Sequence, residues 1–223
     1  MAPASDPDLL VLHGLRLRSF AAAEAIADIT GLPVADVTAR LEGFRDKELT
    51  RYREGVVTGW MLTPTGRTEA QRLLVEELDA IEVADGLDAR GAIDAAYRRF
   101  LQLNPTLLQV CTDWQLRPCD GVDEPVLNDH ADPDYDQQVV DRLRALDAAV
   151  QPVAHDLGCV LDRFDGYGAR LNAALDKTAA GDADWFTKPT IDSYHTVWFE
   201  LHENLLATLG IERGQEPVPT SPT

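Results

Sequence analysis

Apolar residues recur at helical spacing along most of the chain, beginning with three stretches in the first fifty residues. The first stretch is rich in leucine and follows Asp6-Pro7, a pair typical of a helix N-terminus. The second runs over Phe20–Ile29 and ends at Gly31, a residue type that often terminates helices. The third covers residues 34–46, with its apolar positions on one stripe. The pattern therefore predicts three consecutive helices.

An extended pattern follows the third helix. Thr50–Arg53 and Val56–Leu62 predict two short strands, and Glu54-Gly55 between them predicts a hairpin turn. Thr63 and Pro64 then suit the N-cap and the first position of a fourth helix. The predicted order is helix, helix, turn, helix, hairpin, helix.

This order over about seventy residues resembles the winged helix-turn-helix domain of MarR-like bacterial transcriptional regulators. Ala27, Gly31 and Val37 have the spacing of a helix-turn-helix, and Arg51–Val57 stands where the wing belongs. The stretch Leu62-Thr63-Pro64-Thr65-Gly66-Arg67 looks like the LTxxGR sequence that often follows the wing in that family. The resemblance implies that the third helix enters the major groove of double-stranded DNA and that the wing lies along the backbone or the minor groove.

Polar and basic side chains on the third helix and the wing are the candidate DNA contacts. They are Thr38, Arg40, Arg45, Lys47, Arg51 and Arg53. Glu42 and Asp46 project from the outward face of the same helix, and their carboxylates would repel phosphates. The alternative is that these charges form a solvated surface and that the winged helix binds a protein partner.

The rest of the chain shows helical periodicity and no convincing strand pattern. We expect a helix over residues 91–110, interrupted near Asn104-Pro105, and then a packed loop over Cys111–Pro125. Four further helices are expected. They are an amphipathic helix of about sixteen residues around 135–150, the segments Val153–Phe164 and Ala169–Ala180, and a last helix that ends at Gly210.

These patterns predict a mainly α protein with three parts. Residues 1–82 form the winged helix-turn-helix with a small β-hairpin wing, residues 83–213 form an all-α helical bundle, and residues 214–223 form a flexible tail. We expect the helical domain to sense a small ligand or to form a homodimer.

Aromatic residues are concentrated in residues 185–199, which hold five of the fifteen in the chain. Nearby lysine and histidine side chains add the polar groups that a small acidic or aromatic effector would use. The predicted ligand-binding residues are Trp185, Lys188, Tyr194, His195, Trp198 and His202. The alternative is that the apolar members belong to the core and that both histidines are half-buried structural residues.

A dense acidic segment precedes the helix around residue 135 and includes His130. Its alternating aspartates resemble the start of an EF-hand calcium loop, but Gln137 and Leu143 stand where glycine and glutamate are required. We therefore expect no metal there, and expect Asp132 to cap the following helix.

The chain of 223 residues has a net charge of -18, which on its own argues against nucleic acid or an anionic membrane as a partner. The charge is unevenly distributed. Residues 1–80 hold nine Lys/Arg and thirteen Asp/Glu, a net of -4, whereas residues 81–223 carry a net of -14. The half predicted to contact DNA is therefore nearly balanced.

We expect a cytoplasmic protein without a membrane span. The N-terminus is acidic where a signal peptide would be basic, no apolar run approaches the length of a span, and the three cysteines show no CxxC spacing. We expect no cofactor, and the sequence contains none of GxSxG, HExxH, a P-loop or GxGxxG.

The sequence thus predicts a DNA-binding transcriptional regulator whose helical domain responds to a ligand or dimerises. One alternative is an accessory protein that uses the winged helix to bind a partner. A less favoured alternative is an enzyme of the helical domain, which would need His195, His202 and a carboxylate to converge on an open cavity.

Overall fold

The computed structural model describes residues 2–85, 88–119, 122–212 and 215. These residues form two compact units that are not contiguous along the chain. The first unit consists of three segments: the N-terminal stretch that ends at Ile93, Val160–Arg163, and the stretch that begins at His202. The second comprises Asp94–Cys159 and Phe164–Leu201. This division differs from the contiguous parts, 1–82 and 83–213, expected from the sequence.

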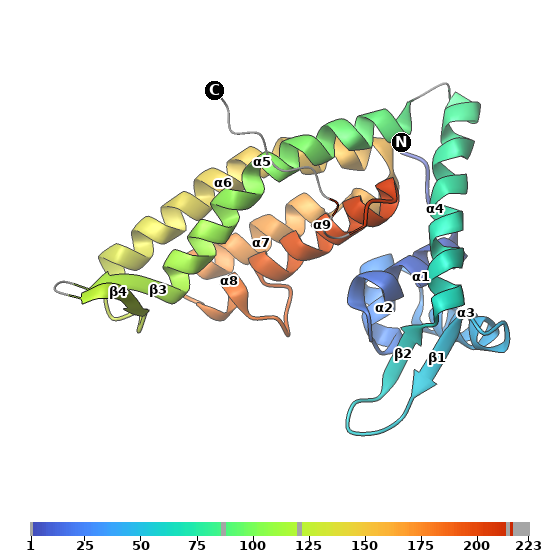
Figure 1. Ribbon diagram of the computed structural model, residues 1–223, viewed down its shortest axis with the longest axis horizontal. Helices are drawn as coiled ribbons and strands as arrows, with labels where there is room; N and C mark the ends of the chain where they lie inside the picture. Colours follow the sequence, from blue (N-terminus) through green and yellow to red (C-terminus); the bar gives the residue numbers. More distant parts are fainter. Residues whose placement is uncertain (1, 86–87, 120–121, 213–214, 216–223) are drawn as a thin grey trace. The chain divides into compact units, whose positions relative to one another are not determined.

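The first unit has three helices, a hairpin and a long helix in the expected order (Figure 1). Its elements are α1 (Pro7–Arg18), α2 (Ala23–Thr30), α3 (Val34–Asp46), β1 (Thr50–Arg53), β2 (Gly59–Leu62) and α4 (Pro64–Asp85). The strands pair antiparallel, with Thr50 opposite Leu62 and Arg53 opposite Gly59. The prediction of a mainly helical protein that begins with a winged helix is confirmed.

Local chemistry explains where these helices begin and end. Gly31 adopts the left-handed conformation (φ 69°) at the end of α2, where a side chain would be strained. The hydroxyl of Thr63 accepts a hydrogen bond from the backbone N–H of Gly66 at 3.0 Å, as an N-cap does. A Cβ at Gly66 would lie 1.9 Å from the carbonyl oxygen of Leu49. The LTxxGR stretch therefore needs its glycine because α4 begins against the backbone that precedes the wing.

The core of this unit is apolar and lies where α1, α2 and α3 meet the hairpin. Leu12, Ile26 and Leu41 are fully buried there, and Trp60 of β2 is 5% exposed. The backbone of Trp60 also bridges to Ala21, with hydrogen bonds of 2.8 and 3.0 Å. The hairpin is thereby attached to the helices at its base.

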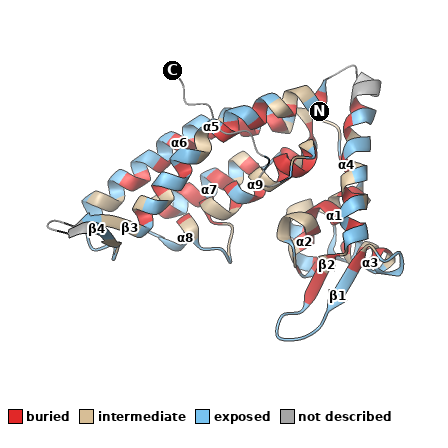
Figure 2. Ribbon diagram, viewed as in Figure 1, coloured by how far each residue is buried: buried red, intermediate tan, exposed pale blue. Residues whose placement is uncertain are grey.

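The second unit contains most of the long helices. Its complete elements are β3 (Leu116–Cys119), β4 (Val122–Leu127), α7 (Tyr167–Ala179) and the short α8 (Asp184–Thr187). Three longer helices belong to it only in part: α5 (Ala89–Gln115) from Asp94, α6 (Pro133–Val160) up to Cys159, and α9 (Tyr194–Leu209) up to Leu201. Phe164, the last residue of the 3₁₀ turn Asp162–Phe164, also belongs to this unit. Figure 2 shows that buried and exposed residues alternate along α5, α6 and α7, as expected for amphipathic helices, whereas α9 is mostly buried.

Two helices run through prolines that were expected to end or separate them. The predicted interruption of α5 near Asn104-Pro105 is wrong, because the helix continues through Pro105. The predicted separate helix over Val153–Phe164 is also wrong, because α6 continues through Pro152. An internal proline removes one backbone hydrogen bond. Buried residues flank both positions, including Leu101, Leu107, Val150 and Val153, and their packing outweighs that loss.

The expected loop over Cys111–Pro125 is also wrong. Its first residues complete α5, and residues 116–119 and 122–125 belong to the antiparallel pair of β3 and β4, with Leu116 opposite Leu127 and Arg117 opposite Val126. Residues 120 and 121 of the expected loop lie outside the described residues. The strands were missed because each contains a proline, which is rare inside strands. The second unit is therefore not entirely helical.

In the described part of the chain, no helix combines the length and the apolar character of a membrane span.

A buried polar network joins the distant segments of the first unit. Arg163, whose side chain is only 3% exposed, forms an ion pair with Glu77 of α4. The same guanidinium donates hydrogen bonds to Thr208 Oγ1 of α9 at 2.9 Å and to Ser5 Oγ at 3.4 Å. The segments around residues 163 and 208 are thus bound to the winged helix by charge-assisted hydrogen bonds.

His13 is a second buried polar residue of this unit. Its Nε2 lies 2.8 Å from Asn204 Oδ1, so this nitrogen carries the proton and donates it to the amide oxygen. Burial, reinforced by the charge of Arg163, lowers the pKa of His13 to about 3. The imidazole is therefore neutral in the folded protein.

The neutral His13 makes folding sensitive to acid. Below pH 6.5 the unfolded chain protonates this residue while the folded chain does not, so the stability present above that pH is lost progressively down to about pH 3. Between pH 7 and pH 5 the loss is about 2 kcal/mol. Urea unfolding of the wild type and of His13→Gln at both values tests this. The stability difference between the two proteins should change by that amount, and an unchanged difference would contradict the assignment.

Candidate functional site

The basic residues predicted to contact DNA lie on α3 and β1 of the first unit. The hydroxyl of Thr50, the first residue of β1, donates to the carbonyl oxygen of Leu41 at 2.9 Å, which fixes the strand against α3. Arg45, near the end of α3, lies 5.8 Å from the ring of Trp60, and Lys47 follows directly. The end of α3 and the first strand of the wing therefore form one structural element.

Four of the six predicted contacts are exposed and lie outside the ion pairs of the described residues. Arg45, Lys47, Arg51 and Arg53 form no ion pair with any side chain in the described ranges. Arg40 differs, because it is paired with Asp8 of α1. The free guanidinium and ammonium groups thus lie at the end of α3 and on β1.

The remaining predicted contact and the two acids of α3 are also placed. The hydroxyl of Thr38 donates to the carbonyl oxygen of Val34 at 2.9 Å, within its own helix. Glu42 and Asp46 are exposed on α3, as the sequence indicated. The tip of the wing adds two exposed apolar residues, Val56 and Val57, beside Gly55, whose φ is 154°.

A pocket of about 730 Å³ lies in the same unit, between α1 and the start of α4. Arg16 and Arg67 line it, and Arg67 has no ion-pair partner within the described residues. Arg16 donates to Gln71 Oε1 at 2.7 Å, and Gln71 donates in turn to the carbonyl oxygen of Ala207 at 3.2 Å. Burial lowers the pKa of Arg16, with Glu203 opposing and Arg67 reinforcing the shift. The pocket has the donors that a small anion requires.

The residues predicted to bind a ligand do not form one site. Tyr194 and Trp198 are buried in the second unit, where the indole N–H of Trp198 donates to Asn104 at 3.1 Å. Lys188 is at the surface, 2.5 Å from Asp184. The ring of Trp185 contacts Lys177, whose Nζ lies 3.3 Å from the ring centroid. The ring centroids of His195 and Phe199 are 6.4 Å apart. His202 belongs to the first unit.

The buried environment of Tyr194 supports a structural role for that residue. Its hydroxyl donates to Asp147 at 3.2 Å, and Gln151 donates to the same carboxylate at 3.1 Å. Burial raises the pKa of Tyr194 and that of Asp147. Burial also lowers the pKa of His195, so its ring favours the neutral form.

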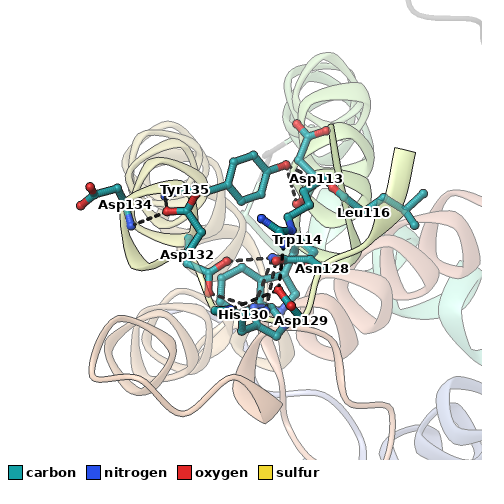
Figure 3. A network of polar contacts seen from close by, with 12 residues as sticks. Asp113, Trp114, Leu116, Asn128, Asp129, His130, Asp132, Asp134 and Tyr135 are labelled. Carbon is teal, nitrogen blue, oxygen red and sulfur yellow. Dashed lines mark hydrogen bonds and ion pairs between the residues drawn. The ribbon is translucent and has the colours of Figure 1, made fainter. Parts of the chain in front are cut away.

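The polar network in Figure 3 was not predicted as a site, although it includes the dense acidic segment around His130. Asn128 is its centre: its amide nitrogen donates to the carbonyl oxygen of Trp114 at 3.1 Å and to Asp136 Oδ1 at 2.8 Å. Its amide oxygen accepts the backbone N–H of His130 at 3.1 Å. Asp132 accepts from the backbone of Asp134 and of Tyr135, both at 3.1 Å, so the predicted helix cap is confirmed.

His130 is held in one orientation by this network. Both amide hydrogens of Asn128 are used elsewhere, so Nδ1 of His130 carries a proton and donates it to Asp136 Oδ2 at 2.9 Å. The imidazole packs on Trp114, with ring centroids 4.5 Å apart, and the backbone has a positive φ of 57°. The opposite nitrogen, Nε2, makes no hydrogen bond within the described part of the chain.

His130 lines an open pocket of about 640 Å³ that also contains Trp114, Asp184 and Lys188. The alternating aspartates gave a signal for this segment, but the pairing of His130 with Asp136 depends on a turn whose geometry the sequence does not reveal. No group of three or more His, Cys, Asp or Glu side chains is arranged to hold a metal ion among the residues that the structure describes.

Comparison of the chain with protein-family models, curated proteins and solved structures finds no match in any of the three.

Removing the side chain of Asn128 should destabilise the second unit. Asn128→Ala loses three hydrogen bonds and leaves the carbonyl oxygen of Trp114 without its partner, which costs about 2 kcal/mol. Urea unfolding followed by circular dichroism measures this. The control is Gln109→Ala, which loses one exposed hydrogen bond to Asp113 and should cost less than about 0.5 kcal/mol. Equal effects would show that the network is not structural.

Proposed function

We propose that the chain is a DNA-binding transcriptional regulator that acts in the cytoplasm as a homodimer. In this proposal α3 enters the major groove and the wing follows the phosphate backbone. The observation that carries it is the set of four exposed basic side chains, Arg45, Lys47, Arg51 and Arg53, that form no ion pair within the described residues. The order of elements that resembles MarR-like regulators supports the same function.

The availability of these charges contrasts with the pairing of four arginines in the second unit. In the second unit Arg98, Arg99, Arg142 and Arg144 all form ion pairs with aspartates. A paired guanidinium has little to gain from a phosphate because its charge is already compensated. The free cations of α3 and β1 would instead displace condensed counterions from DNA, which is the main source of non-specific affinity. A dimer would double the number of such contacts.

The pocket of Arg16 and Arg67 supports regulation by a small molecule. It lies between α1 and α4, the helices that support α3 and the wing, so an anionic effector bound there would favour one arrangement of these elements. This placement differs from the effector site expected around Trp198, whose side chain is buried.

A second candidate function is binding of a protein partner by the winged helix. The exposed Val56 and Val57 at the tip of the wing favour it, because exposed apolar residues are common at protein interfaces. Glu42 and Asp46 on α3 favour it as well, since they oppose contact with phosphates.

DNA binding is tested by fluorescence anisotropy with a duplex from the region upstream of the protein's own coding sequence, at several salt concentrations. Arg51→Ala and Arg53→Ala should each weaken binding and lower the slope of log affinity against log salt by about 1. Arg98→Ala is the matched control, because Arg98 is exposed but paired with Asp94 in the second unit. Absence of binding at low salt, or equal effects of all three variants, would favour the protein partner.

A further inference from the structure

A second pocket of the first unit is apolar in its walls and acidic in its polar groups. It has a volume of about 460 Å³ and lies among the N-terminal segment, the middle of α4 and the turn after α6. Its apolar walls are formed by Pro3, Leu9, Leu73, Ala80, Ile81 and Leu161. The volume is within the range of small-molecule sites, and the walls suit a hydrocarbon group.

Three carboxylates line this pocket, and no lysine or arginine does. Asp6 accepts the backbone N–H of Asp8 at 2.7 Å and forms no ion pair in the part of the chain that the structure describes. Glu76 is paired with Arg72 at the surface of α4, and Glu77 is paired with the buried Arg163. Arg163 compensates Glu77, but Arg72 is shared between Glu69 and Glu76. Asp6 and this shared group therefore leave a net negative charge at the pocket, which attracts a cation and repels an anion.

Glu77 adds an unsatisfied acceptor at this position. Its Oε2 bonds to Arg163, but its Oε1 is buried and makes no hydrogen bond among the described residues. A buried acceptor without a donor costs roughly 1–3 kcal/mol. A ligand that carries an N–H group would recover part of this cost after a small rotation of the carboxylate.

We propose that this pocket binds a small organic cation that has an ammonium group and an apolar chain. The ammonium group lies near Asp6 and Glu77, and the hydrocarbon chain lies against Leu9, Leu73 and Leu161. Glu76 lines both this pocket and the one of Arg16 and Arg67, but arginines line only the latter. The proposal does not depend on DNA binding, because it concerns only the chemistry of this pocket.

Three probes of equal length separate charge from hydrophobicity. Isothermal titration calorimetry of the full-length protein at pH 7 compares hexylamine, hexanol and hexanoate. The expected order of affinity is hexylamine, then hexanol, with no measurable binding of hexanoate. Equal affinity for all three, or preference for hexanoate, would overturn the proposal.

Variants then test the position of the cation. Asp6→Asn removes the charge but keeps a good N-cap for α1, and Glu76→Gln removes a second charge at the rim. Each should raise the dissociation constant of hexylamine about threefold, and the double variant about tenfold. Glu77 is left unchanged because it holds Arg163.

The control distinguishes the pocket from general attraction to an acidic protein. Asp79 is exposed on the same helix and does not line the pocket, so Asp79→Asn should leave hexylamine binding unchanged. Ala80→Phe adds bulk at the wall and should abolish binding, while circular dichroism confirms that the variant is folded. Equal weakening by Asp79→Asn and Asp6→Asn, or unchanged binding to a folded Ala80→Phe variant, would contradict the site.

Discussion

The ion pair between Arg163 and Glu77 is the interaction on which the first unit depends. Both side chains are nearly inaccessible, and the guanidinium also bonds to Thr208 and Ser5. Transfer of two charges from water is costly, so removal of either partner from such a pair leaves an uncompensated buried charge and typically costs 3–5 kcal/mol. The winged helix is therefore not a module of the first eighty residues alone, because residues near 163 and 208 complete its polar interior.

This arrangement connects the separate functional proposals physically. Glu77 is both the partner of Arg163 and a lining residue of the acidic pocket, so a cation bound there would act on the same carboxylate that anchors the distant segments. In the pocket of Arg16, Gln71 accepts a hydrogen bond from Arg16 and donates one to the carbonyl oxygen of Ala207. Both pockets thus contact the residues that hold α1, α4 and the end of α9 together.

Short-range chemistry made the first part of the fold predictable. Gly31, Thr63 and the bounds of β1 follow from caps and strand patterns that act over a few residues. Pro105 and Pro152 were misleading because their cost is local, whereas the packing that outweighs it comes from residues distant in sequence. The partnership of Arg163 with Glu77, 86 positions away, has no local signal. Arg45, Lys47, Arg51 and Arg53 are exposed, whereas the proposed ligand aromatics Tyr194 and Trp198 are buried.

Native-state hydrogen exchange of the full-length protein tests most directly whether the first unit is one cooperative structure. Amides of Val11–Leu15 in α1 and of Asn204–Thr208 in α9 should open with the same free energy. Arg163→Ala should lower both opening free energies by the same amount, about 3–5 kcal/mol. If the first unit is less stable than that, the variant should unfold the whole unit. If α9 amides lost protection while those of α1 kept theirs, the winged helix would be independent of Arg163, and the first unit would not be one cooperative structure.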